Sequence, residues 1–114
     1  MARYRGLTLR VLGKGAPAMG PGKAELVELI AETGSISAAA RAMGMSYRRA
    51  WQLVEALNKD YRERVVVTAA GGARGGGARV TPFGRRLVVR FRAMEDKASA
   101  AIAQDLRRFQ RYIP

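Results

Sequence analysis

The stretch GSISAAARAMGMSYRRAWQLVEAL, residues 34–57, decides the fold, because its pattern predicts two short helices joined by a tight turn. Ser35 stands just before an alanine-rich run, where its hydroxyl can accept a hydrogen bond from a free N–H of the first helical turn. Gly44 follows that run, and glycine tolerates the positive φ that often ends a helix. Ser46 can then cap the second helix. The arrangement predicts a helix-turn-helix over about residues 35–61.

The second helix has one apolar and one polar face. Its apolar positions recur every three or four residues, as on a buried helical face: Ala50, Leu53, Val54 and Leu57. The opposite face of its first turns carries residues suited to DNA contact: Tyr47, Arg48, Arg49 and Gln52. An ordinary antiparallel helix pair with solvated charges is the alternative for this stretch alone.

The composition favours a polyanionic partner. The chain has 114 residues, enough for one domain over 1–114, and 21 Lys and Arg against 9 Asp and Glu give a formal charge of +12. So large a charge is typical of nucleic-acid binding. It also fits an anionic membrane surface or ribosomal RNA.

Several classes of function are disfavoured by what the sequence lacks. Cysteine and histidine are absent, so no zinc site of the usual kind, no disulfide and no catalysis through a histidine can form. The carboxylates lie scattered on faces that we expect to be solvated, so we expect no enzyme, no metal and no cofactor. Lys14 and Lys23 are not followed by Ser or Thr, so the P-loop spacing is missing. There is no membrane-spanning apolar run and no signal peptide, and the cytoplasm is the default location.

The N-terminal third predicts a strand, a loop and a helix. Residues 4–11 alternate, with Leu7, Leu9 and Val11 on one face, which predicts a short strand. GKGAPAMGPG, residues 13–22, predicts a loop. A helix is expected from about Gly22 to Glu32, with an outward acidic face.

A hairpin follows the second helix of the motif, whose residues 58–61 we expect to fray. Strands are predicted at about 64–69 and 79–81, around a glycine-rich tip at 70–78 that carries Arg74. A basic hairpin directly after a recognition helix is typical of a DNA-binding wing, here about residues 64–81. A plain surface loop is the alternative.

A long helix is predicted over about 82–112, with Thr81 as N-cap and Pro82 in the first helical position. Its apolar residues recur at three or four residues along the whole length. Little chain remains to cover the distal part, so we expect a homodimer, with the N-terminal strand near the interface. The residues predicted for dimerisation are Leu7, Leu9, Phe91, Met94, Ala98, Ile102, Leu106 and Phe109.

In these motifs the chain resembles the N-terminal DNA-binding domain of ModE-type molybdate-responsive regulators and, more distantly, LysR-type regulators. The resemblance lies in the segments MGPG (19–22), IAETGSIS (30–37), SYRRAW (46–51), the glycine-rich tip, and VTPFG (80–84). It implies a mainly α protein with a small β hairpin, that is, a winged helix-turn-helix with a long C-terminal dimerisation helix. The Ser-Ala-Arg-Asn-Gln motif of the molybdate-binding domains is absent, so molybdate sensing is not expected to transfer.

The resemblance further implies a transcriptional regulator that binds double-stranded DNA at an inverted repeat as a homodimer. By analogy, Ser46, Tyr47, Arg48, Arg49 and Gln52 would lie in the major groove and Arg74 on the wing. Arg48 and Arg49 suit contact with guanine, and Gln52 suits contact with adenine. Lys23 and Arg41 are expected at phosphates, and Trp51 in the core. A small-molecule or protein effector is possible but not identified by the residues. The alternatives are a sequence-nonspecific architectural DNA-binding protein and an RNA-binding protein.

Overall fold

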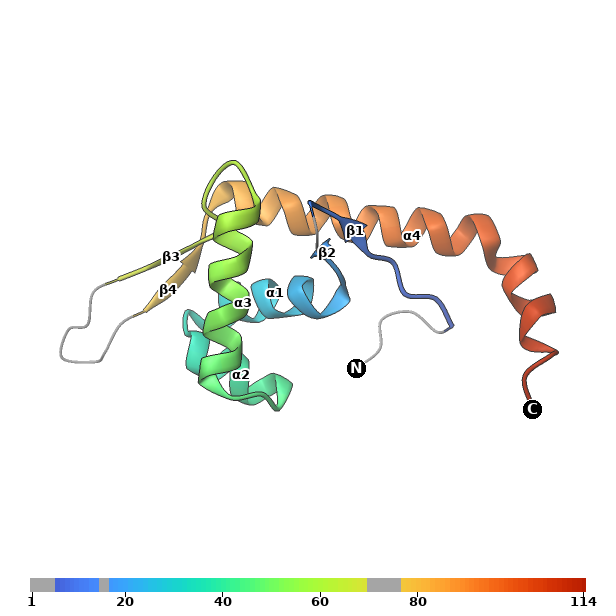
Figure 1. The fold of residues 1–114 in the computed structure, drawn as a ribbon, viewed down its shortest axis with the longest axis horizontal. Coiled ribbons are helices and arrows are strands. Elements are labelled where there is room, and N and C mark those ends of the chain that lie inside the picture. The colour runs from blue at the N-terminus through green and yellow to red at the C-terminus, as the bar shows by residue number, and fades with distance from the viewer. Residues whose placement is uncertain (1–5, 15–16, 70–76) are drawn as a thin grey trace.

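The computed structural model describes residues 6–14, 17–69 and 77–114. The elements follow one another as β1 (Val11–Leu12), β2 (Pro17–Met19), α1 (Pro21–Thr33), α2 (Ile36–Met43), α3 (Tyr47–Asp60), β3 (Val66–Thr68), β4 (Ala78–Val80) and α4 (Pro82–Gln110). Figure 1 shows α1, α2 and α3 gathered under the first half of α4, with the β3–β4 hairpin projecting on one side. The prediction of a mainly α protein with a small β hairpin and a long C-terminal helix is confirmed.

The core lies where α1, α3, β3 and the first half of α4 meet. Its largest fully buried side chains come from all four: Phe91, Leu26, Ile30, Leu57, Val27, Val54, Val65 and Val66. Val27 is fully buried, because α1 packs against both α2 and α4.

Gly84 lets α4 approach the hairpin closely. The predicted cap is confirmed, since the Thr81 hydroxyl accepts a hydrogen bond from the Gly84 N–H at 3.0 Å. A Cβ on Gly84 would lie 2.5 Å from the Val65 carbonyl oxygen, so a larger residue would force the helix away from β3.

The N-terminal third differs from the prediction in two places. Of the strand expected over 4–11, only Val11 pairs in the described part, and Leu12 beyond it pairs as well, because the partner strand β2 is three residues long and leads at once into α1. That partner lies inside 13–22, which was predicted as a loop. Pro17 begins it, where the absent N–H costs no ladder bond, and Met19 is buried.

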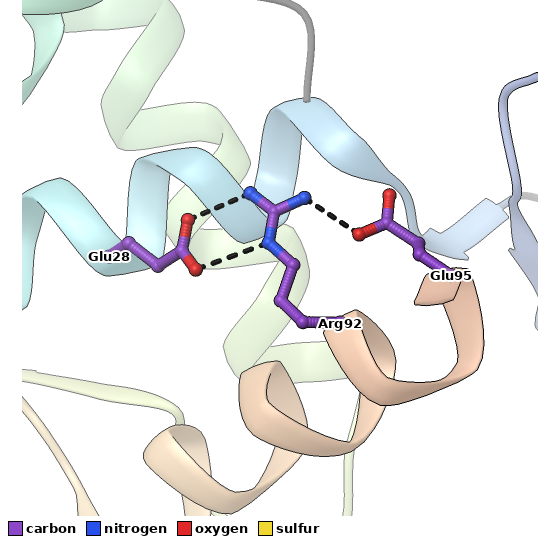
Figure 2. A network of polar contacts seen from close by, with 3 residues as sticks. All are labelled: Glu28, Arg92 and Glu95. Carbon is purple, nitrogen blue, oxygen red and sulfur yellow. Dashed lines mark hydrogen bonds and ion pairs between the residues drawn. The ribbon is translucent and has the colours of Figure 1, made fainter. Parts of the chain in front are cut away.

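A polar network fixes α4 on α1. Figure 2 shows Arg92 of α4 between Glu28 of α1 and Glu95, one turn further along α4. The guanidinium donates two hydrogen bonds to the Glu28 carboxylate, at 2.7 and 3.1 Å, and one to Glu95 Oε1 at 2.9 Å. The hydrogen bond to Glu28 raises the pKa of Arg92, burial opposes this, and the hydrogen bond to Glu95 adds to the rise.

This network corrects one prediction about charged residues. Only 12% of the Arg92 side chain is exposed. The carboxylates were all expected on solvated faces, yet Glu95 is 2% exposed. The local spacing of charges could not show the pair of Arg92 with Glu28, because these two residues are 64 positions apart.

The second half of α4 runs past the core. The helix has 29 residues, or about 43 Å at 1.5 Å per residue, and the molecule measures 55 × 29 × 24 Å. Its radius of gyration is 16.0 Å, against about 13 Å for a compact domain of this length. Figure 1 shows the distal turns of α4 extending on the side opposite to the hairpin.

Candidate nucleic-acid interface

The α2–α3 pair has the predicted geometry of a helix-turn-helix. The Ser35 hydroxyl accepts from the Ala38 N–H and the Ser46 hydroxyl from the Arg49 N–H, each at 3.0 Å. Gly44 ends α2 with φ +70°. Ala39, Ala40 and Ala50 are buried between the helices, and such small side chains let the two helix backbones pack closely.

The outermost face of α3 carries Arg48, Gln52 and Glu55. All three are exposed, and their spacing of four and three residues places them on one row opposite the buried Ala50 and Val54. Sequence reasoning named the first two and missed Glu55, although its place one turn beyond Gln52 could have indicated it. An arginine, an amide and a carboxylate are side chains that can distinguish bases in the major groove.

The wing-side flank of α3 carries Tyr47 and Trp51. Tyr47 is exposed at the start of the helix. Trp51 is half-buried and packs against the core, while it also lines, with Asn58 and Val66, a groove of about 670 Å³ between α3 and β3. Trp51 is therefore a packing residue with one exposed side.

The hairpin is bonded to α3 and to the start of α2. Asn58, expected in a fraying helix end, accepts hydrogen bonds from the Val65 and Val66 N–H groups and donates one to the Val66 carbonyl. At the other strand the Ala78 N–H donates to the Gly34 carbonyl at 3.0 Å. The two strands of the wing are thus bonded beside both ends of the helix-turn-helix, β3 to Asn58 and β4 to Gly34, the residue that ends α1. Arg74 lies outside the described residues, whereas Arg79 is exposed on β4.

The residues predicted at phosphates lie apart from each other. Arg41 is exposed in the last turn of α2. Lys23 lies in the first turn of α1, where its ammonium donates to the Pro17 carbonyl at 2.9 Å. It lines a cavity together with Arg49, so the structure places these two together and Arg41 elsewhere.

The predicted dimerisation set divides into three groups. Phe91 is 1% exposed inside the chain's own core, which corrects its assignment to an interface. Leu7 and Leu9 are half-buried, as are Ala98, Ile102 and Leu106 on α4. A Cβ on Gly6 would contact Leu106 and Gln110, so the N-terminal stretch covers part of the distal helix, contrary to expectation. Met94 and Phe109 are 44% and 63% exposed.

Two kinds of feature are absent from the described residues. Across 6–14, 17–69 and 77–114, His, Cys, Asp and Glu form no group of three or more that could bind a metal ion. Within the same ranges no helix has the length and apolar character that a membrane crossing requires.

Fold and site together define a winged helix-turn-helix domain: a capped helix pair, an exposed polar row on the second helix, and a hairpin fixed beside it. The profile of the lysR family of bacterial regulatory helix-turn-helix proteins matches residues 23–85, more than half of the chain. The protein belongs to this family of bacterial regulatory helix-turn-helix proteins.

The curated relatives agree with the predicted ModE-type resemblance, which is confirmed. The chain is 42% identical over 101 residues to the molybdenum-pterin-binding protein MopB of Rhodobacter capsulatus. The matched stretch covers 89% of this chain and 36% of that protein. It is 40% identical over 77 residues to the molybdenum transport protein ModE of Azotobacter vinelandii, covering 68% of this chain and 28% of the relative. Against the DNA-binding transcriptional dual regulator ModE of Escherichia coli K12 the identity is 40% over 68 residues, 60% of this chain and 26% of the relative. The chain therefore spans about a third or less of each relative.

Proposed function

We propose that this chain is the DNA-binding domain of a sequence-specific transcription regulator, which binds an inverted repeat as a homodimer. The observation that carries the proposal is the exposed row Arg48–Gln52–Glu55 on α3. In this fold the second helix of the motif enters the major groove, where these side chains would meet base edges. Arg48 suits guanine O6 and N7, Gln52 suits adenine, and Glu55 can accept from the cytosine amino group.

The charge of the chain supports the DNA partner. A net charge of +12 gives strong attraction to a phosphate backbone, and this attraction weakens steeply with salt. Charge alone would also support an architectural DNA-binding protein or an RNA-binding protein. The polar row favours sequence-specific binding, because base-edge contacts supply specificity and phosphate contacts do not.

The distal half of α4 supports the homodimer. The face that α4 turns to its own core, with Val88 and Phe91, continues past the core at three- and four-residue spacing through Ile102, Leu106 and Phe109. The N-terminal stretch covers this face only in part, since Phe109 is still 63% exposed. A second copy of the same helix would bury the remainder, and a two-fold dimer would present two α3 helices to two half-sites about 34–36 Å apart.

Fluorescence anisotropy tests the proposal with three labelled probes: a duplex selected from a random pool by this protein, an unselected duplex of equal length, and a structured RNA of equal charge. We expect the selected duplex to bind at least 10³-fold more tightly than the unselected one at physiological salt. Equal affinity for both duplexes would indicate an architectural protein. Preference for the RNA would contradict the proposal.

A further inference from the structure

A cationic cavity lies on the flank of α3 that faces away from the wing. Its volume is about 420 Å³. Arg49 and Leu53 line it from α3, while Trp51 and Asn58, on the other flank of the helix, line the groove beside β3. The recognition helix thus has the hairpin on one side and this cavity on the other.

Three cations from three segments line the cavity. Arg10 directly precedes β1, Lys23 lies in the first turn of α1 and Arg49 lies in the first turn of α3. None of its described lining residues is acidic. The hydrogen bond to Pro17 holds the Lys23 ammonium at the cavity wall and leaves it two more N–H donors.

The rest of the lining selects the kind of ligand. Met45, Pro17 and Leu53 give the cavity walls that are mainly apolar and offer no carboxylate to offset the cations. Like charges gathered in this way repel one another, so an anion entering the cavity is favoured. A phosphate group fits, because guanidinium and ammonium groups both form charge-assisted hydrogen bonds with its oxygens.

We infer, on the basis of the proposed function, that this cavity receives a backbone phosphate of the DNA strand on the far side of α3 from the wing. A helix lying in the major groove has a phosphate backbone along each flank, since the groove is about 12 Å wide. The wing lies toward one backbone, and Arg49, Lys23 and Arg10 bind the other. Arg49 is then a positioning contact to phosphate, whereas the sequence alone suggested that it binds guanine.

The test compares Arg49→Ala and Arg49→Lys with Arg48→Ala, using the selected and unselected duplexes by anisotropy at several salt concentrations. We expect Arg49→Ala to lower the affinity for both duplexes by the same factor. It should also reduce the slope of log K against log[salt] by about one. Arg49→Lys restores most of the affinity that Arg49→Ala loses, because an ammonium serves for phosphate, whereas it lacks the planar fork that fixes a guanine contact. Arg48→Ala lowers the ratio of the affinity for the selected duplex to that for the unselected one.

The controls are Arg90→Ala, which removes one exposed charge from α4, and a thermal melt of each variant. Arg49 and Arg90 are both exposed, so neither substitution should unfold the protein. Neutral methylphosphonate links placed one at a time along the duplex give a second measurement. At one position on the strand that flanks α3, the neutral link should lower the affinity of the unaltered protein for the duplex. The same link should leave the affinity of Arg49→Ala unchanged.

Three results would overturn the inference. The first is a tenfold loss of the selected-to-unselected ratio in Arg49→Ala without rescue by lysine, which would make Arg49 a base contact. The second is binding of inorganic phosphate to the free protein, lost in Arg49→Ala while duplex affinity stays unchanged, which would make a free oxyanion the ligand. The third is failure of the unaltered protein to bind either duplex. That failure contradicts the proposed function itself, so it differs from the first two.

Discussion

The side chain of Asn58 binds both backbone polar groups of Val66: Nδ2 donates to the Val66 carbonyl at 2.9 Å, and Oδ1 accepts from the Val66 N–H at 3.0 Å. Oδ1 also accepts from the Val65 N–H at 2.7 Å. Asn58 lies in the last turns of α3 and Val66 begins β3. The recognition helix therefore sets the position of the wing through one amide.

Asn58→Ala is expected to destabilise the protein by about 2–3 kcal/mol, because three part-buried hydrogen bonds of about 1 kcal/mol each are lost. Urea unfolding followed by circular dichroism measures the change. The neighbouring Lys59→Ala is the control, since Lys59 is exposed and should change stability by less than about 0.5 kcal/mol. Equal effects of the two substitutions would contradict the bridging role.

Arg92→Ala is expected to cost about 3–5 kcal/mol, because it takes the guanidinium away from the buried Glu95 carboxylate. Glu28→Gln should cost only about 1 kcal/mol, because Glu28 is partly exposed and its amide can still accept from Arg92. Denaturant unfolding of both variants gives the comparison. A smaller loss in Arg92→Ala than in Glu28→Gln would show that Glu95 does not depend on Arg92.

Phe109→Ser is expected to weaken a homodimer at least tenfold, since it removes an exposed aromatic from the distal face of α4. Val89→Ser is the matched control: Val89 is 68% exposed on the same helix, but twenty residues, about 5.6 turns, place it on the opposite face. Sedimentation equilibrium of both variants and the unaltered chain measures the dissociation constant. If Val89→Ser dissociates the dimer and Phe109→Ser does not, the proposed interface is wrong.

Stability at high pH should report on Tyr61, whose hydroxyl donates to the Ala18 carbonyl at 3.0 Å. Burial raises the pKa of Tyr61 above its ordinary value of 10.0, and the Asp60 charge adds to the rise. The folded state therefore holds this proton more tightly than the unfolded state. Its contribution is complete below about pH 10 and is lost as the pH rises through the folded pKa.

Tyr61→Phe is accordingly expected to be about 1 kcal/mol less stable than the unaltered protein at pH 8. The difference should shrink at pH 11, where the unfolded state has already lost the Tyr61 proton. Urea unfolding of both proteins at the two pH values measures this difference. A difference that stays constant from pH 8 to pH 11 would rule out the titration of Tyr61 as its cause.

Local chemistry explains what the sequence could predict. Ser35, Gly44, Ser46 and Thr81 act within four residues of their own positions, so their capping roles follow from type and spacing, and the structure has them as predicted. The long helix was equally predictable, because no glycine follows Gly84 within it. The exposed row on α3 follows from helical periodicity once the buried face is known.

The remaining features depend on contacts between distant parts of the chain. The strand at Pro17–Met19 forms because Val11 offers it a partner, and Pro17 itself is a poor strand signal. The bonds of Asn58 need β3 beside α3, and the pair of Arg92 with Glu28 needs α4 across α1. The cationic cavity joins residues 10, 23 and 49, which no periodicity relates.

The central claim is that two copies of α3 contact bases in two half-sites of one operator. Selection of duplexes from a random pool, followed by hydroxyl-radical footprinting of the selected duplex, tests this most directly. We predict one enriched motif arranged as an inverted repeat, with protected tracts centred about 34–36 Å apart. Absence of an enriched motif, or a single protected tract at saturating protein, would contradict the account.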